Sequence, residues 1–159
     1  MNAMVAGLAL VAGIAGSASA MGTRPVKAET ITYERGPCHG TCPVYRVTVS
    51  SSGQGTFEGI RYTAVTGMRS FRVTGAQWAE FSRRLSAERP AGETLLTGQE
   101  ACRMFITDLP TIDVRWSGAG KPGHLAYSMG CDRPTHARMA KALEAAPQAL
   151  PIAAFIGAR

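Results

Sequence analysis

Four cysteines, Cys38, Cys42, Cys102 and Cys131, carry the clearest potential chemistry of this sequence. An even number of cysteines in an oxidising compartment favours disulfides, and four cysteines allow three pairings. Prolines and a glycine around Cys38 and Cys42 indicate a turn, whereas Cys102 and Cys131 flank a segment with the pattern of a hairpin. We therefore expect disulfides between Cys38 and Cys42 and between Cys102 and Cys131.

The Cys38–Cys42 pair could also exchange with other disulfides if a nearby cation, such as Arg35 or His39, acidified one thiol. Its three intervening residues differ from the two of thioredoxin-like motifs, and no βαβ pattern surrounds it. A structural disulfide that pins a turn is the favoured interpretation. Thiol–disulfide exchange through Cys38 and Cys42 remains the alternative function.

Other catalytic chemistry has little support in the sequence. Zinc sites prefer paired ligands two to four residues apart, and only Cys38 and Cys42 approach that arrangement, so we expect no metal and no cofactor. The sequence contains no Gly-x-Ser-x-Gly, no His-Glu-x-x-His and no phosphate-binding glycine loop. We expect a non-enzymatic protein and assign no catalytic residues.

Aromatic and basic side chains on the expected strands could form a binding surface for a glycan, a peptide or another component of the cell envelope. The alternative is that the aromatic rings fill the core, that the arginines are solvated and that the aspartate only shapes a turn. The candidate binding residues are Tyr33, Arg35, His39, Tyr45, Arg46, Arg61 and Asp108.

The chain is basic, with 17 Lys and Arg against 11 Asp and Glu and a net charge of +6. A basic charge favours polyanionic partners in general. Here the arginines are spread along the chain and form no run longer than Arg83-Arg84, and arginine outnumbers lysine as is common in GC-rich genomes. Together with the expected export, this distribution argues against nucleic acid as the partner.

The N-terminus resembles a cleavable leader. Residues 1–20 contain no charged side chain, although signal peptides usually start with a Lys or Arg, and an apolar run at 5–14 precedes Ala18 and Ala20 in an Ala-x-Ala pattern. This run is shorter than the roughly 20 apolar residues that span a bilayer. We expect a signal peptide at 1–20, a mature protein that begins near Met21, and a periplasmic or secreted location without a stable membrane anchor.

The remaining chain divides into a linker at 21–29, a single domain at 30–146 and a C-terminal tail at 147–159. Thr74 and Gln77 form a capping-box pattern before one helix, and a second helix is expected at 135–146, whereas 94–105 has no clear pattern. The expected fold class is α+β, an antiparallel meander with about two helices on one face. Strands are expected at 30–35, 44–49, 56–59, 61–65, 70–73, 111–116 and 124–128.

The cysteine loop continues into a specific motif, Cys-x-Gly-x-Cys-Pro-x-Tyr, at residues 38–45. With Val65-Thr66-Gly67 and Asp108-Leu109-Pro110-Thr111, it resembles an uncharacterised family of bacterial exported proteins that is a domain of unknown function. The resemblance covers residues 30–145 and implies export, but it carries no activity. Cys102 and Cys131 lie outside the family pattern, so we expect their disulfide to be a local crosslink.

Overall fold

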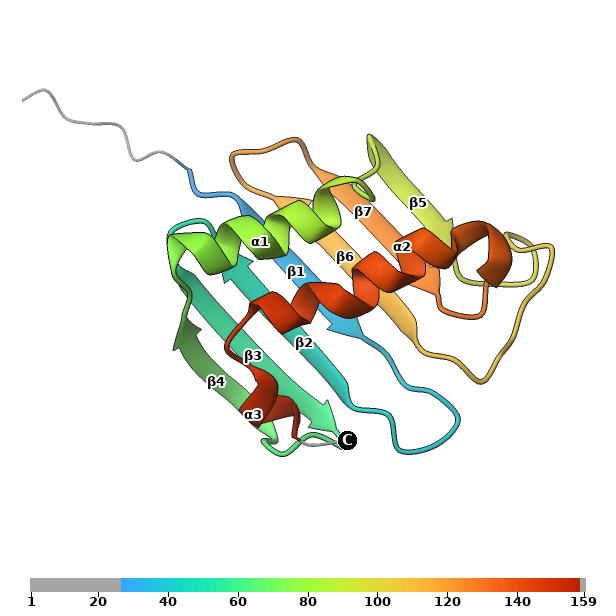
Figure 1. Cartoon of the computed structure of the whole chain (residues 1–159), viewed down its shortest axis with the longest axis horizontal. Helices are drawn as coiled ribbons and strands as arrows, with labels where there is room; N and C mark the ends of the chain where they lie inside the picture. Colours follow the sequence, from blue (N-terminus) through green and yellow to red (C-terminus); the bar gives the residue numbers. More distant parts are fainter. Residues whose placement is uncertain (1–26, 158–159) are drawn as a thin grey trace, which may run out of the picture.

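The computed structural model describes residues 27–157, so the expected signal peptide and most of the expected linker lie outside the described residues. Within this range, seven strands form one sheet in the order β4-β3-β2-β1-β6-β7-β5 (Figure 1). Their bounds are β1 Thr30–Arg35, β2 Val44–Ser50, β3 Gln54–Arg61, β4 Gly67–Arg72, β5 Gly92–Leu96, β6 Thr111–Ser117 and β7 Gly123–Ser128.

The strands pair antiparallel everywhere except at one edge, where β5 runs parallel to β7. Each of the first three strands pairs with the next one along the chain, but β1 also pairs with β6. The sheet as a whole is therefore not a simple meander, and β1 is its central strand. A mostly antiparallel sheet with helices confirms the α+β fold class.

Side-chain alternation gives the sheet a buried inner face and an open outer face. In β1, Ile31, Tyr33 and Arg35 are buried, whereas Thr32 and Glu34 between them are only partly buried. Helices α1 and α2 both cross the inner face (Figure 1). The core lies between the sheet and these helices, and its fully buried members include Val47, Val49, Phe57, Phe81, Leu85, Ile112, Val114, Leu125 and Leu143.

Helix α1, Gly75–Ser86, begins where the capping-box pattern predicts. The Thr74 side chain accepts a hydrogen bond from the backbone N–H of Gln77 at 3.2 Å, and the Gln77 side chain accepts one from the Thr74 N–H at 2.9 Å. Two otherwise unpaired backbone donors are thereby satisfied. The apolar side of α1 then packs Phe81 and Leu85 into the core.

Helix α2, Arg133–Ala145, contains a proline in its first turn and continues directly into a 3-10 turn, η1, Ala146–Ala149. After a short bend, the four-residue helix α3, Ala153–Ile156, completes the described chain. The expected C-terminal tail thus contains two short helical segments that pack on the core, because Leu150 and Ile152 are buried.

The strand expected at residues 61–65 is wrong, because most of this segment bends away to meet α3. The backbone N–H groups of Ala64 and Val65 donate to the carbonyls of Ile156 and Phe155 at 3.1 and 3.0 Å. These bonds replace the ladder that a strand would need. Strand β5 was not among the strands predicted from the sequence.

No helix within residues 27–157 is long and apolar enough to cross a membrane.

Candidate functional site

The motif loop between β1 and β2 is closed by a disulfide between Cys38 and Cys42, whose Cα atoms are 5.8 Å apart. The backbone N–H of His39 donates to the carbonyl of Asp108 at 3.1 Å, which holds the loop against the segment that leads into β6. His39 and Asp108, both candidate binding residues, therefore meet through backbone atoms.

Arg35 is the last residue of β1 and faces the inner side of the sheet, between Tyr45 of β2 and Ile112 of β6. It is 7% exposed and is the one buried charged residue within 27–157. Its Nε has no hydrogen-bond partner, and no carboxylate in the described part of the chain forms an ion pair with it. Buried charges are ordinarily paired, because removing a charge from water is costly.

The neighbouring Tyr33 connects β1 to α2. Its hydroxyl donates a hydrogen bond to the carbonyl of Leu143 at 3.2 Å, and its ring stacks on that of Tyr45 with centroids 6.2 Å apart. Burial raises the pKa of Tyr33 well above its ordinary value, and the positive charge of Arg35 opposes this shift. Tyr33 is therefore a neutral hydrogen-bond donor to Leu143, and its hydroxyl is also hydrogen-bonded to the side chain of Arg35.

A pocket of about 480 Å³ lies beside Arg35, between the end of β1, the disulfide loop and α2. Cys42 contributes to its wall from the loop, while Arg133, Lys141 and Glu144 contribute from α2. Three cationic side chains against one carboxylate make the lining electropositive. The remaining lining residues are mostly apolar and are Leu109, Pro110, Met129, Pro134, Ala137 and Ala140.

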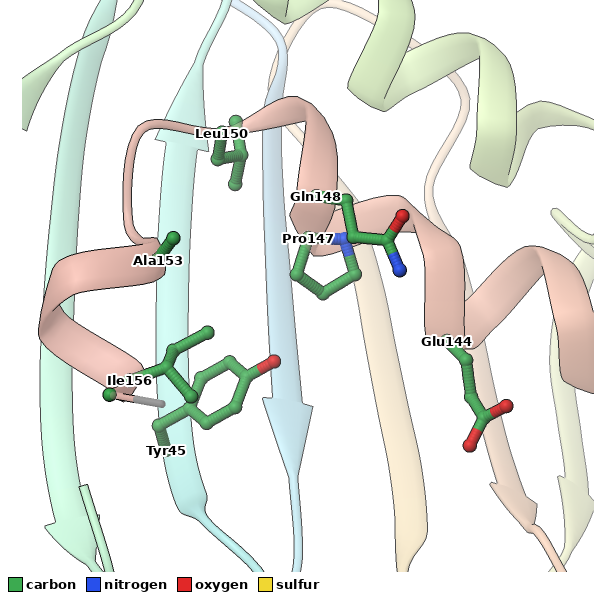
Figure 2. A pocket seen from close by; sticks show the side chains of 8 residues that line it. Tyr45, Glu144, Pro147, Gln148, Leu150, Ala153 and Ile156 are labelled. Atoms are coloured by element: carbon green, nitrogen blue, oxygen red, sulfur yellow. The ribbon is translucent and has the colours of Figure 1, made fainter. Parts of the chain in front are cut away.

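A second pocket, of about 490 Å³, shares Glu144 with the first and lies over Tyr45. Figure 2 shows the Tyr45 ring next to the side chain of Ile156, and Ala153 and Leu150, also from the segment after α2, line the same pocket farther from the ring. The ring is 2% exposed and also stacks on Phe57, so it forms part of the core as well as part of a pocket wall.

Arg46 and Arg61 lie away from these pockets. Arg46 directly follows Tyr45 in β2 and so points to the outer face, where it forms ion pairs with Glu34 at 2.7 Å and Glu58 at 2.8 Å. Arg61 is exposed at the end of β3, over the ring of Tyr62. The candidate binding residues therefore do not form a single surface, because alternation places consecutive strand residues on opposite faces.

The contribution of α2 to the pocket at Arg35 was not among the sequence-based predictions. Arg133, Ala137, Lys141 and Glu144 are spaced by four, four and three residues. This spacing places them on one side of a helix, so the helical pattern contains a usable signal. The helical spacing alone does not show that this side of α2 faces the end of β1.

Comparison with protein families identifies residues 29–148 as a match to "Domain of unknown function (DUF6438)". The chain belongs to the DUF6438 family. The matched range includes both disulfides and every residue that lines the pocket at Arg35. Membership confirms the expected resemblance to a family of unknown function. Comparisons with curated proteins and with solved structures gave no match.

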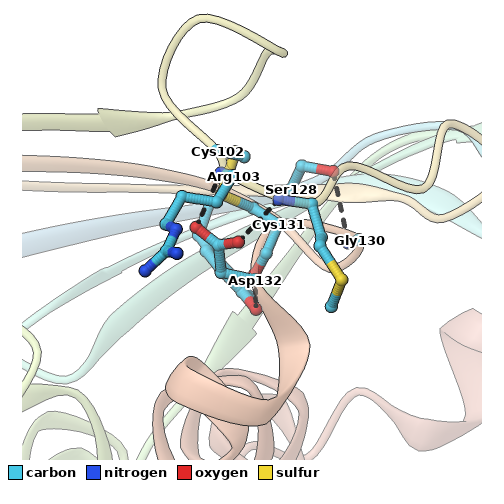
Figure 3. Close-up of a disulfide and its surroundings, with 8 residues drawn as sticks. Cys102, Arg103, Ser128, Gly130, Cys131 and Asp132 are labelled. Carbon is cyan, nitrogen blue, oxygen red and sulfur yellow. Dashed lines mark hydrogen bonds between the residues drawn. A yellow bond between two sulfur atoms is a disulfide. The ribbon is translucent and has the colours of Figure 1, made fainter.

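The second disulfide of the DUF6438 domain joins Cys102 to Cys131 and ties the loop after β5 to the start of α2 (Figure 3). Next to it, the Asp132 carboxylate accepts hydrogen bonds from the backbone N–H groups of Met104 at 2.7 Å and Arg103 at 3.0 Å. These two bonds hold the pKa of Asp132 below its ordinary value. Disulfide and carboxylate together fix the end of α2 that borders the pocket at Arg35.

The outer face of the DUF6438 domain carries a separate polar cluster around His124. Its Nδ1 lies 2.6 Å from Glu93 and its Nε2 lies 2.8 Å from Asp113, which also pairs with Arg115 at 3.1 Å. Hydrogen bonding to Asp113, with a further contribution from Glu93, raises the pKa of His124 against the opposing effect of partial burial. Across residues 27–157, no group of three or more His, Cys, Asp or Glu is placed to hold a metal ion.

Proposed function

We propose that this DUF6438 domain is an exported, non-catalytic binding module that takes a component of the cell envelope into the pocket at Arg35. The observation that carries the proposal is the pocket itself, which combines apolar walls with a buried cation that forms no ion pair within residues 27–157. Its volume of about 480 Å³ falls within the range of roughly 300–1,000 Å³ that is usual for ligand sites. The ligand is a glycan, peptide or protein group that reaches this cavity.

The proposed export rests on the leader pattern of residues 1–20 and on the disulfides. Both cysteine pairs of the domain are oxidised, and disulfides persist mainly outside the cytoplasm. Fractionation of the native host, followed by N-terminal sequencing, tests this placement. We expect a periplasmic or secreted protein that begins near Met21, whereas an intact Met1 on a cytoplasmic protein would overturn it.

The binding role is tested by retention of envelope components on the immobilised, oxidised domain. Ala137 is an exposed alanine of α2 in the pocket wall, so Ala137→Trp fills the cavity without removing a charge. Ala79→Trp is the matched control, because Ala79 is exposed on α1 and lines none of the described pockets.

We expect the wild-type domain and Ala79→Trp to retain the same components from a native envelope extract, and Ala137→Trp to lose them. Equal retention by Ala137→Trp, or no retention by the wild-type domain above a blank matrix, contradicts the proposal.

Thiol–disulfide exchange is a second candidate, favoured by one observation. Cys42 lines the same pocket as Arg35, Arg133 and Lys141, and nearby cations lower the pKa of a cysteine thiol. Exchange activity predicts turnover in insulin reduction that Cys42→Ser abolishes while the fold is retained. A purely structural bridge predicts no turnover by the wild-type domain.

A further inference from the structure

Arg35 differs from the other arginines of the domain that have defined contacts. Arg46, Arg84 and Arg115 each form an ion pair with a carboxylate at 2.7–3.1 Å, although their side chains are 27–58% exposed. Arg89 shares with Arg35 an unpartnered Nε, but its guanidinium pairs with Glu29 at 2.6 Å. Arg35 is the most deeply buried of them and has no carboxylate partner within residues 27–157.

The charged residues that line the pocket with Arg35 add positive charge and do not neutralise that of Arg35. Arg133 and Lys141 line the same pocket, and Glu144 is the one carboxylate among the lining residues. Glu144 is exposed on α2 and forms no ion pair with Arg35. The pocket therefore presents a net positive wall to whatever enters it.

The apolar part of the lining indicates that the ligand also has an apolar portion. Leu109 and Pro110 come from the segment before β6, Met129 follows β7, and Ala137 and Ala140 come from α2. A small, fully hydrated anion would leave these surfaces without a partner. A ligand that carries its charge on an apolar body satisfies both parts of the cavity.

We propose that the pocket binds an anionic group, a carboxylate or a phosphate, carried on an apolar body, with the anion held by Arg35. A planar guanidinium matches either group through paired N–H donors, and the buried position strengthens the interaction. This inference rests on the proposed function, because it assigns the chemical class of ligand to the same pocket.

The test uses three probes that share one eight-carbon alkyl chain and differ in the head group: octanoate, octyl phosphate and uncharged octanol. The two anions are kept below their micelle concentrations and octanol below its solubility limit. Affinities are measured by calorimetry on the oxidised domain, and the Nε–H signal of Arg35 is followed by NMR. We expect the better anion to bind about 10- to 100-fold more tightly than octanol, as for a hydrogen bond to a charged group. The ratio between octanoate and octyl phosphate separates carboxylate from phosphate recognition.

Arg35→Met keeps an unbranched apolar side chain and removes the guanidinium with its charge, so the preference for anions over octanol should vanish. Arg138→Met is the matched control, because Arg138 is exposed on α2 and does not line the pocket. Glu144→Gln removes the one carboxylate of the lining, so it should strengthen octanoate binding. Ala137→Trp should prevent all three probes from binding, because the indole ring fills the space that their alkyl chains would occupy. This variant provides a test even if Arg35→Met does not fold.

The inference is overturned if octanol binds the wild-type domain as tightly as both anions, if folded Arg35→Met keeps the preference, or if no probe binds. It is also overturned if octanoate binding leaves the Arg35 Nε–H signal unchanged. A domain that retains envelope components through the Ala137 side of the pocket, yet fails these tests, keeps its binding role and loses only this ligand class.

Discussion

The hydroxyl of Tyr33, in the central strand, donates a buried hydrogen bond to the carbonyl of Leu143, 110 positions later in α2. Tyr33→Phe removes this bond and leaves the Leu143 carbonyl without its partner. We expect a loss of about 1 kcal/mol in the free energy of unfolding, within the usual range of roughly 0.5–1.5 kcal/mol. Urea denaturation measures it, with Tyr62→Phe on the exposed surface as the control. An equal loss in both variants would contradict a role for the bond.

The two disulfides should contribute unequally to stability. Cys102 and Cys131 are 29 positions apart, and Cys38 and Cys42 are four apart. Because a longer closed loop removes more entropy from the unfolded chain, we expect double replacement by alanine to cost about 3–4 kcal/mol for the long bridge and about 2 kcal/mol for the short one. Denaturation midpoints under non-reducing conditions compare them, and the reverse order would show that strain or local contacts dominate.

Asp132 should stabilise the domain most at neutral pH. Its backbone hydrogen bonds lower the pKa from the ordinary value of 3.8, so the folded state favours the carboxylate. The contribution is present above pH 3.8 and disappears as the pH falls through the lowered pKa. Asp132→Asn accepts only one of the two bonds, so it should be less stable at pH 7 and lose less stability on acidification.

Acid titration of unfolding in both proteins measures this difference. Asparagine tolerates the positive φ of 40° at this position, so the variant changes charge and acceptors rather than backbone conformation. Asp108→Asn in an exposed loop is the control and should follow the wild-type curve. Parallel curves for Asp132→Asn and the wild-type domain would contradict the prediction.

His124 should have the opposite dependence on pH. Asp113 and Glu93 raise its pKa from 6.5, so the folded state favours the protonated ring. This stabilisation is complete below pH 6.5 and is lost as the pH rises through the raised pKa. Urea midpoints across this range should fall in the wild-type domain and stay flatter in His124→Gln. His39→Gln, in the exposed disulfide loop, should keep the wild-type slope.

Local patterns predict much of this fold because they arise from contacts near in sequence. Alternation in β1, β2, β6 and β7 reports which side chains face the core, and the pair of Thr74 and Gln77 fixes the start of α1 within a few residues. The short spacing and turn residues of the first cysteine pair similarly favour the disulfide that the structure contains.

The missed features depend on distant partners. β5 is a five-residue edge strand that pairs with β7, about 30 positions later in the chain by their register, and its own residues carry no alternating pattern. Residues 64 and 65 bend because α3 offers them carbonyls from the far end of the chain. The pocket at Arg35 is likewise assembled from β1, the motif loop, the segment before β6, and α2. Tyr33, Arg35 and Tyr45 can be selected as candidates from sequence, but their separation from Arg46 and Arg61 follows from the face each residue occupies.

The central place of β1 constrains how a newly made chain can reach this architecture. A chain that emerges N-terminus first can pair β1 with β2 almost at once, whereas the opposite edge stays open until residues 111–117 have also emerged. During that interval β1 presents a row of unpaired backbone donors and acceptors, the kind of edge that recruits foreign strands. The half of the sheet from β1 to β4 can therefore form while one edge of β1 is still unpaired. Pairing of β6 with β1 then satisfies this edge and joins the two halves of the sheet.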